Sequence, residues 1–374
     1  MRILFIDPSR WQYTVDTPYE RPLGGSQSAL CYLAAELAQL GHSVTVLNGV
    51  TTESESRGVK LRNLEALGAP SFSDSFDVGI VLNLACGHNL RRDLNVKIPL
   101  VLWNQHAHDQ EAIQKLSRSR EQREWSAFAF VSDWQRGCFE KAFSLPGGKA
   151  KVMRNAVSPA FAKFLNVDPW FMTGGAPVLF YTSTPFRGLD ILLSCFPRIR
   201  QSVPDVRLRI YSSMQVYQVS PEADRYRDLY ETARNMAGVE YIGSVSQTQL
   251  AQDLPQMAAL AYPSNFAETS CIAVTEAMAA GAAVYTTRLG ALPETTGMHA
   301  TMIDWQPDKT ALAGAFADMV TRSLQEAREN PEDAVALLAQ RRAHIQANYL
   351  WPARAKEWER WLATVIGKGE SRPL

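Results

Sequence analysis

Two carboxylates, Glu268 and Glu276, carry the clearest chemical signal in this chain, eight positions apart in the segment FAETSCIAVTEAMAAG. A helix is predicted to begin just after Glu268, with Thr269 or Ser270 as its N-cap, and to end before Gly281. Glu268 then lies in the loop before the helix, and Glu276 lies within the helix. A phosphorylated ligand with hydroxyl groups would match this arrangement, because phosphate favours free N–H groups at a helix N-terminus and carboxylates accept from hydroxyls. Taken alone, the spacing fits a chance pair of glutamates equally well.

Composition indicates a globular protein of two domains. The chain has 374 residues, of which 46% are hydrophobic, and its 38 basic and 38 acidic residues give no net charge. Such a balance disfavours nucleic acid as a partner. The five cysteines are scattered and odd in number, which favours a reducing compartment and no zinc site. The sequence predicts neither a signal peptide nor a transmembrane helix, so a cytoplasmic location is expected.

Apolar runs and helical periodicity alternate in two successive blocks, which is typical of α/β domains with parallel sheets. The block after the Gly- and Pro-rich segment 166–177 repeats the pattern of the first. We therefore expect an N-terminal domain over 1–165, a C-terminal domain over 166–345 and a last helical segment over 346–374. The predicted strands are 3–6, 44–47, 77–82, 99–103, 128–131 and 151–153, then 178–181, 206–211, 239–242, 259–263 and 282–286; the predicted helices include 26–40, 188–200 and 223–236.

Further polar groups follow predicted strands, where sites in α/β proteins gather. Gly25, in a Gly-Gly pair, precedes the first long helix, although a flexible loop explains that pair as well. His106 and His108 follow the strand 99–103, and an ordinary loop histidine is the alternative. Arg187 is expected to open the helix 188–200 and to grip an anion together with backbone N–H groups. A surface charge at a helix start is the alternative there.

These segments, taken together and in order, resemble retaining glycosyltransferases of family 4. The Glu268/Glu276 pair resembles the E-x7-E signature of that family. The segment LGGSQSALCYLAAELAQLGHSVTVL resembles its opening glycine loop and first helix, and YTSTPFRG resembles its strand followed by a cation and glycine. Arg187 takes the usual lysine position, but threonine and serine stand where a second arginine is common.

The resemblance implies a GT-B fold, with two Rossmann-like domains whose parallel sheets face each other across a cleft. It also implies hexose transfer from a nucleotide sugar, with a UDP-sugar as the expected donor, without metal or cofactor. Glu268, His106 and Arg187 would take the catalytic roles, with Glu276 on the ribose. The implied donor-binding residues are Gly25, Ser183, Val245, Thr269, Ser270, Cys271, Ile272 and Glu276.

The acceptor stays open between a glycan, a lipid-linked group and a small molecule. A sugar-nucleotide epimerase or hydrolase on the same fold and a non-catalytic nucleotide-sugar-binding protein are the alternative functions. Peripheral contact with the inner membrane face is a further open alternative. The most basic local segment, KLSRSREQR over 115–123, favours a solvated helix face over a membrane or partner patch.

Overall fold

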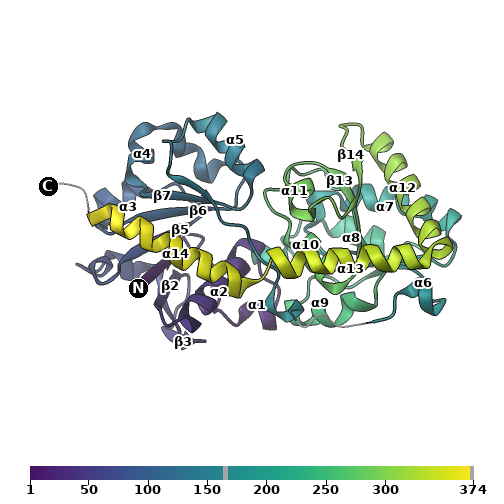
Figure 1. Ribbon diagram of the computed structural model, residues 1–374, viewed down its shortest axis with the longest axis horizontal. Coiled ribbons are helices and arrows are strands. Elements are labelled where there is room, and N and C mark those ends of the chain that lie inside the picture. Colours follow the sequence, from purple (N-terminus) through teal and green to yellow (C-terminus); the bar gives the residue numbers. More distant parts are fainter. Residues whose placement is uncertain (163–166, 371–374) are drawn as a thin grey trace. The chain divides into compact units, whose positions relative to one another are not determined.

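The computed structural model describes residues 1–162 and 167–370 and divides into two compact units (Figure 1). The first unit comprises Met1–Thr17, Gly25–Ala156 and the segment from Trp351 on. The second comprises Pro18–Gly24 and Val157–Leu350. The expected boundary at residues 165 and 166 lies outside the described residues, and so does the start of the expected linker 166–177. Within that linker a short helix, α6, covers Trp170–Thr173.

The first unit is built on a sheet with strand order β3-β4-β2-β1-β5-β6-β7-β8 among the described residues. All neighbouring pairs are parallel except β3 and β4, which are antiparallel. The central strands β1, β5 and β6 are almost wholly buried, as expected where helices cover both faces of a parallel sheet. The strands are β1 Arg2–Ile6, β2 Ser43–Asn48, β3 Ser54–Ser56, β4 Val59–Asn63, β5 Val78–Leu82, β6 Leu100–Asn104, β7 Ala127–Phe130 and β8 Ala150–Val152.

The helices of the first unit include one from the far end of the sequence. Helix α14 packs along α2, where Trp351 lies against Tyr32 with ring centroids 6.0 Å apart. Trp358 meets Trp103 of β6 edge-on at 5.2 Å, and both rings are buried. The helices are α2 Gly25–Gln39, α3 Gly87–Leu94, α4 Ser119–Glu124, α5 Asp133–Phe143 and α14 Trp351–Glu370; α1, Thr17–Glu20, spans the division between the units.

The second unit has a wholly parallel sheet with strand order β11-β10-β9-β12-β13-β14 among the described residues. The strands are β9 Val178–Tyr181, β10 Arg207–Ile210, β11 Val239–Tyr241, β12 Ala259–Tyr262, β13 Ala283–Arg288 and β14 Thr301–Asp304. The longer helices are α7 Leu189–Ser202, α8 Arg227–Arg234, α9 Gln247–Asp253, α10 Ile272–Ala280, α12 Lys309–Glu329 and α13 Pro331–Asn348, with α11 short at Leu292–Thr296.

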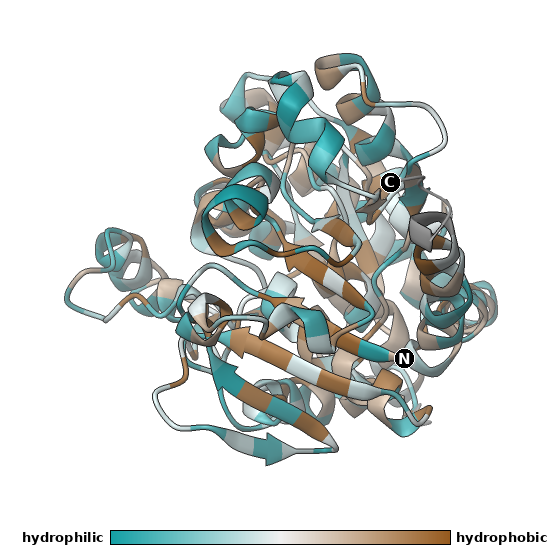
Figure 2. Cartoon of the chain, turned by 90° about the vertical axis from the view of Figure 1, so that its left-hand side faces the viewer, coloured by the Kyte–Doolittle hydropathy of each residue, from teal (hydrophilic) through white to brown (hydrophobic). Residues whose placement is uncertain are grey.

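Helices cover both faces of each sheet because the strand order reverses once in each unit. In the second unit the chain moves from β9 outward to β10, and later from β12 outward to β13 in the opposite direction. Right-handed crossovers then put α7 and α10 on opposite faces. The reversal falls between β9 and β12 in this unit and between β1 and β5 in the first. Figure 2 shows strands with long brown, hydrophobic stretches and helices in which teal, hydrophilic residues alternate with brown ones.

The predicted strands all form, within one or two residues of their expected ends. The strands β3, β4 and β14 were not predicted from the sequence. The helix expected over 223–236 is confined to α8, because Asp224 caps a turn by accepting from the N–H groups of Met214 and Tyr226. The helix expected from residue 188 begins one residue later, since Gly188 has a left-handed φ of 106°.

The contact of α14 with the first unit gives a stability prediction. Trp358→Ala removes a fully buried ring and should lower the free energy of unfolding by about 3–5 kcal/mol. Trp361→Ala is the matched control, because Trp361 lies on the same helix but is only half-buried. Denaturant titration measures both variants. Equal losses would contradict the assignment of Trp358 to the core of this unit.

Candidate functional site

The loops that follow β9 and β12 meet at the point where the strand order of the second unit reverses. These two strands are neighbours and parallel, so their carboxyl ends lie at the same edge of the sheet. Ligands of open α/β sheets bind at such a reversal. The two loops touch closely at Gly188, where a Cβ atom would lie 2.2 Å from the carbonyl oxygen of Pro263. Only glycine fits there, which fixes the spacing of the loops.

A buried ion pair joins the two loops. Arg187 precedes α7, in a 3-10 turn over Pro185–Arg187, and its Nη1 atom donates to both carboxylate oxygens of Glu268, at 2.7 and 2.8 Å. The hydroxyl of Tyr262, the last residue of β12, donates to Oε1 of the same carboxylate. Glu268 is only 1% exposed. Arg187 therefore does not open the helix as predicted, and its charge is already matched within the protein.

The surroundings of this pair keep Arg187 charged and Tyr262 protonated. Burial by itself lowers the pKa of Arg187, but the Glu268 carboxylate raises that pKa well above its usual value. Burial, and then the charge of Glu268, raise the pKa of Tyr262. The guanidinium lies over the ring of Phe266, 4.6 Å from its centroid. Ser183, a predicted donor-binding residue, donates to the Tyr262 hydroxyl at 3.4 Å.

The helix after Glu268 starts later than predicted. Its N-cap is Cys271, which makes no side-chain cap hydrogen bond among the described residues, so neither Thr269 nor Ser270 caps the helix. The Glu268 carbonyl accepts the N–H of Ala291 at 2.7 Å, so Glu268 is tied to the turn after β13 and not to the start of the helix. A Cβ at Gly290 would lie 2.5 Å from that same carbonyl oxygen, so this approach requires glycine. The N-cap residue of α10 therefore adds no side-chain cap hydrogen bond of its own to the start of the helix.

Glu276 is the second carboxyl group of the motif and lies in the middle of α10. Its side chain is buried, and its Oε1 has no hydrogen-bond partner among the described residues. Burial raises the pKa of Glu276 to about 8, although a hydrogen bond with the side chain of Gln247 lowers it somewhat. A buried acceptor without a partner is costly, which makes Glu276 ready to accept from a ligand.

The other predicted donor-binding residues of this unit lie between Glu268 and the start of α10, except Val245, which lies in another loop. Thr269 and Cys271 are buried, Ser270 and Ile272 are half-buried, and Val245 lies half-buried in the loop between β11 and α9. Sequence reasoning missed Tyr262 and Gln247. Tyr262 could have been selected from the sequence, because it is a tyrosine at the end of a predicted buried strand. Gln247 could not, because its contact with Glu276 depends on where α9 lies in the fold.

The predicted residues of the first unit, considered by itself, lie near its own strand reversal. Gly25 is the first residue of α2, and His106 follows β6. Burial lowers the pKa of His106 to about 4, while the nearby Asp7 carboxylate raises it. His106 is therefore neutral at pH 7, and its Nδ1 is buried without a partner among the described residues. His108 is also half-buried with an unpartnered Nδ1.

Asp7 is a further polar residue of this edge that sequence reasoning did not select. It directly follows β1 and is 2% exposed. Its carboxylate accepts from the Tyr13 hydroxyl at 2.7 Å, from the Gln27 amide at 3.2 Å and from the N–H of Ser9 at 3.0 Å. These bonds hold a negative charge at the carboxyl end of the central strand.

Neither a metal site nor a membrane-spanning helix emerges from the part of the chain that the structure describes. No group of three or more His, Cys, Asp or Glu side chains in residues 1–162 and 167–370 could hold a metal ion. None of the described helices has both the length and the apolar character needed to cross a membrane.

The sequence of the second unit matches a known family. Residues 176–322, which contain both glutamates and Arg187, match the family model of glycosyl transferases group 1. This segment is similar to group 1 glycosyl transferases. It includes every strand of the second sheet, from β9 to β14. No curated protein matches the sequence.

Solved structures resemble the whole chain. A glycosyltransferase from Rickettsia africae has a TM-score of 0.74 at 12% identity, over 98% of each chain. Sucrose-phosphate synthase from Thermosynechococcus elongatus scores 0.68 at 15% identity, over 98% of this chain and 100% of that one. Anabaena HepE, solved with UDP-glucose, scores 0.68 at 15% identity, over 97% and 100%. At such identities the likeness concerns the fold, and it confirms the predicted GT-B class.

The raised pKa of Glu276 predicts a pH dependence of stability. The folded protein holds this proton to about pH 8, whereas the unfolded chain releases it near 4.5. The contribution of the neutral carboxyl to stability is therefore fully present below about pH 4.5 and is lost as the pH rises through 8. Each unit of difference between the folded and unfolded pKa corresponds to about 1.4 kcal/mol of unfolding free energy. Glu276→Gln should flatten the fall in unfolding free energy between pH 5 and 8.

Denaturant titration across this pH range measures the effect. Glu329→Gln, at an exposed position of α12, is the control and should leave the profile unchanged. If Glu276→Gln follows the original pH profile, the carboxyl of Glu276 is not the group that titrates.

Proposed function

We propose that the protein is a retaining glycosyltransferase of family 4, which transfers a hexose from a nucleotide sugar, with a UDP-hexose as donor. The observation that carries this proposal is the meeting of Arg187 and Glu268 at the strand reversal, beside the start of the helix α10 that carries Glu276. One cation, a helix N-terminus and two carboxyls suit a ligand that combines phosphates with sugar hydroxyls. Anabaena HepE, of the same fold, was solved with UDP-glucose.

In the proposed binding mode each group has one partner. The diphosphate takes the N-terminus of α10 and the guanidinium of Arg187. The ribose hydroxyls donate to Glu276, whose Oε1 has no partner among the described residues. When the Arg187 side chain binds the phosphate, Glu268 loses the hydrogen bonds from that guanidinium. The hydroxyls of the transferred sugar then donate to Glu268 in their place.

The chemical step follows from the same charges. As the bond between the anomeric carbon and the leaving oxygen breaks, negative charge grows on the diphosphate and positive charge on the sugar. Arg187 and the helix N-terminus stabilise the first charge, and Glu268 stabilises the second. Glu268 is a poor nucleophile because the Tyr262 hydroxyl and the hydroxyls of the transferred sugar occupy its oxygens in this binding mode. Attack by the acceptor on the face that the diphosphate leaves is therefore favoured, which retains configuration without a metal.

The acceptor is a glycan, a lipid-linked group or a small molecule that binds the first unit. His106 would contribute there as a neutral imidazole, which can donate or accept a hydrogen bond near the developing charge. We place the enzyme in the cytoplasm, with its acceptor reached in solution or at the inner membrane face.

Thermal unfolding with nucleotide sugars tests the proposal. A donor at 100 times its dissociation constant should stabilise the protein by about 2.7 kcal/mol. UDP-glucose, UDP-galactose, UDP-N-acetylglucosamine and GDP-mannose form the panel. His106→Ala should keep UDP affinity and reduce donor turnover by about 100-fold. Lack of stabilisation by every donor would refute the proposal. Quantitative release of free sugar or an epimer without any acceptor would favour the hydrolase or epimerase alternative.

The phosphate contact of Arg187 has a test of its own. Arg187→Ala should weaken UDP by at least about tenfold and uridine by much less, because uridine has no phosphate. That variant also leaves the buried Glu268 carboxylate without its cation. The double variant Arg187→Ala/Glu268→Gln therefore separates the loss of the phosphate contact from the effect of the unpaired carboxylate. Arg207→Ala, at an exposed position of β10, is the control. Calorimetry measures both ligands; equal losses for UDP and uridine would mean that Arg187 does not bind phosphate.

A further inference from the structure

A pocket of about 200 Å³ lies in the first unit, between α3 and the segment that leads into α4. Both elements belong to a part of the chain that the glycosyltransferase match over 176–322 does not include. Four cationic side chains and a single carboxylate contribute to its wall. We call it the basic pocket; its lining residues are His88, Asn89, Arg92, Lys115, Arg118, Arg120 and Glu121.

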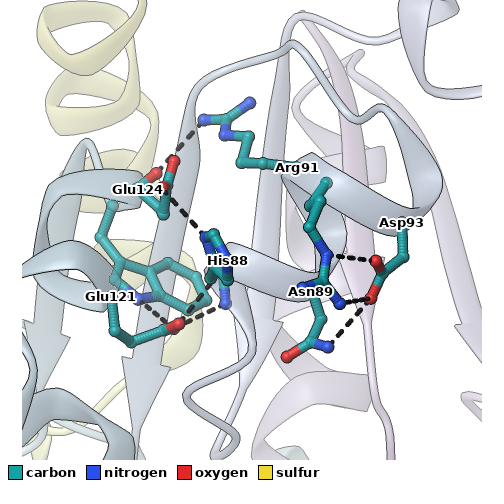
Figure 3. A network of polar contacts seen from close by, with 9 residues as sticks. His88, Asn89, Arg91, Asp93, Glu121 and Glu124 are labelled. Atoms are coloured by element: carbon teal, nitrogen blue, oxygen red, sulfur yellow. Dashed lines mark hydrogen bonds and ion pairs between the residues drawn. The ribbon is translucent and has the colours of Figure 1, made fainter.

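The carboxylate in the wall belongs to the frame of the pocket. Glu121 is 2% exposed and accepts from the N–H of Gly87 at 2.6 Å, the N–H of His88 at 3.0 Å and the Trp125 indole at 3.0 Å. Figure 3 shows Glu121 reaching from α4 to the start of α3. The two backbone bonds satisfy the first N–H groups of α3, so any attraction for an anion comes from the side chains.

The backbone that carries the cations is also fixed. The N–H of Arg118 donates to the Lys115 carbonyl at 3.0 Å, and the Arg118 carbonyl accepts from the N–H of Glu121 at 2.9 Å. Ile113 and Leu116 anchor the same segment in the core, at 0% exposure. The pocket therefore has a rigid rim, from which exposed cationic side chains extend.

The cations of the rim differ in how their charges are matched. Arg92 binds Asp93 through two hydrogen bonds, at 2.6 and 3.2 Å. Lys115 donates to the neutral amide oxygen of Asn89 at 3.3 Å and has no carboxylate partner within the described ranges. Neither Arg118 nor Arg120 has a carboxylate partner among the described residues. Like charges so close together repel one another, and a bound anion would remove that repulsion.

We propose that the basic pocket binds a phosphate group, with Arg118, Arg120 and Lys115 as its ligands. Guanidinium groups bind phosphate oxygens through paired hydrogen bonds, and Lys115 adds a point charge. The volume of about 200 Å³ falls below the usual range for drug-sized ligands, so the pocket suits one phosphate group better than a whole nucleotide sugar. The phosphate comes from a small phosphate ester in solution or from a phospholipid headgroup.

The test compares the full chain with Arg118→Gln/Arg120→Gln. Inorganic phosphate is titrated by calorimetry against a sodium chloride solution of equal ionic strength. Binding should weaken by at least about tenfold in the double variant. The matched control, Arg207→Gln/Arg322→Gln, removes two exposed arginines of β10 and α12 and should bind as the parent does. Thermal unfolding without phosphate should be unchanged in both variants, which rules out a folding defect.

A second arm identifies the source of the phosphate. Sedimentation with vesicles of phosphatidylglycerol and phosphatidylcholine is compared with vesicles of phosphatidylcholine alone. Phosphate binding in solution that depends on Arg118 and Arg120 supports a soluble ester. Binding only to the anionic vesicles, with the same dependence, supports the lipid headgroup. If neither probe binds, or if the double variant binds either probe as the parent does, the proposal is wrong.

Discussion

A carboxylate that is out of water needs a partner, and this requirement organises the second unit. Removing one member of a buried ion pair typically costs about 3–5 kcal/mol, so the loop that carries Glu268 and the turn that carries Arg187 are held together. The close approaches at Gly188 and Gly290 keep the backbone of both loops in place around the pair. A ligand that draws Arg187 away must at the same time satisfy Glu268. Phosphate binding and sugar binding are thereby coupled through one pair of side chains.

The two buried carboxyl groups of the motif, Glu268 and Glu276, differ in their hydrogen-bond partners and in their pKa. Glu268 keeps a cation and a phenol as neighbours, whereas Glu276 has one amide neighbour and a raised pKa. One site thus contains a carboxylate with its partners already in place and a carboxyl that is neutral until a ligand arrives. The first unit shows the opposite arrangement in its basic pocket, where the cationic side chains stay exposed to solvent instead of being buried against a carboxylate.

The sequence allowed the fold to be predicted because each buried strand is a short apolar run and each long helix has its own periodicity. It also located Glu268 and Arg187 after strand ends and Glu276 within the helix that follows Glu268. What it could not supply is pairing over long distances. Arg187 and Glu268 are 81 positions apart, and their contact depends on β9 and β12 being neighbours. The late start of α10 has a similar origin, because the bond from Ala291 to the Glu268 carbonyl comes from a turn beyond β13. Short strands such as β3 were not predicted, because their residues are polar and largely exposed and so form no apolar run in the sequence.

Helix α14 has a consequence for how the protein is made. Its buried tryptophans complete the core of the first unit, yet they follow the whole of the second unit in the sequence. A ribosome adds about 5–20 residues per second, so roughly 10–40 s pass between the synthesis of Ala156 and that of Trp358. During that interval the apolar faces of α2 and β6 that α14 later covers lack their partner. The second unit is nearly continuous in sequence and can finish folding first, so the domain that begins the chain is the last to be completed.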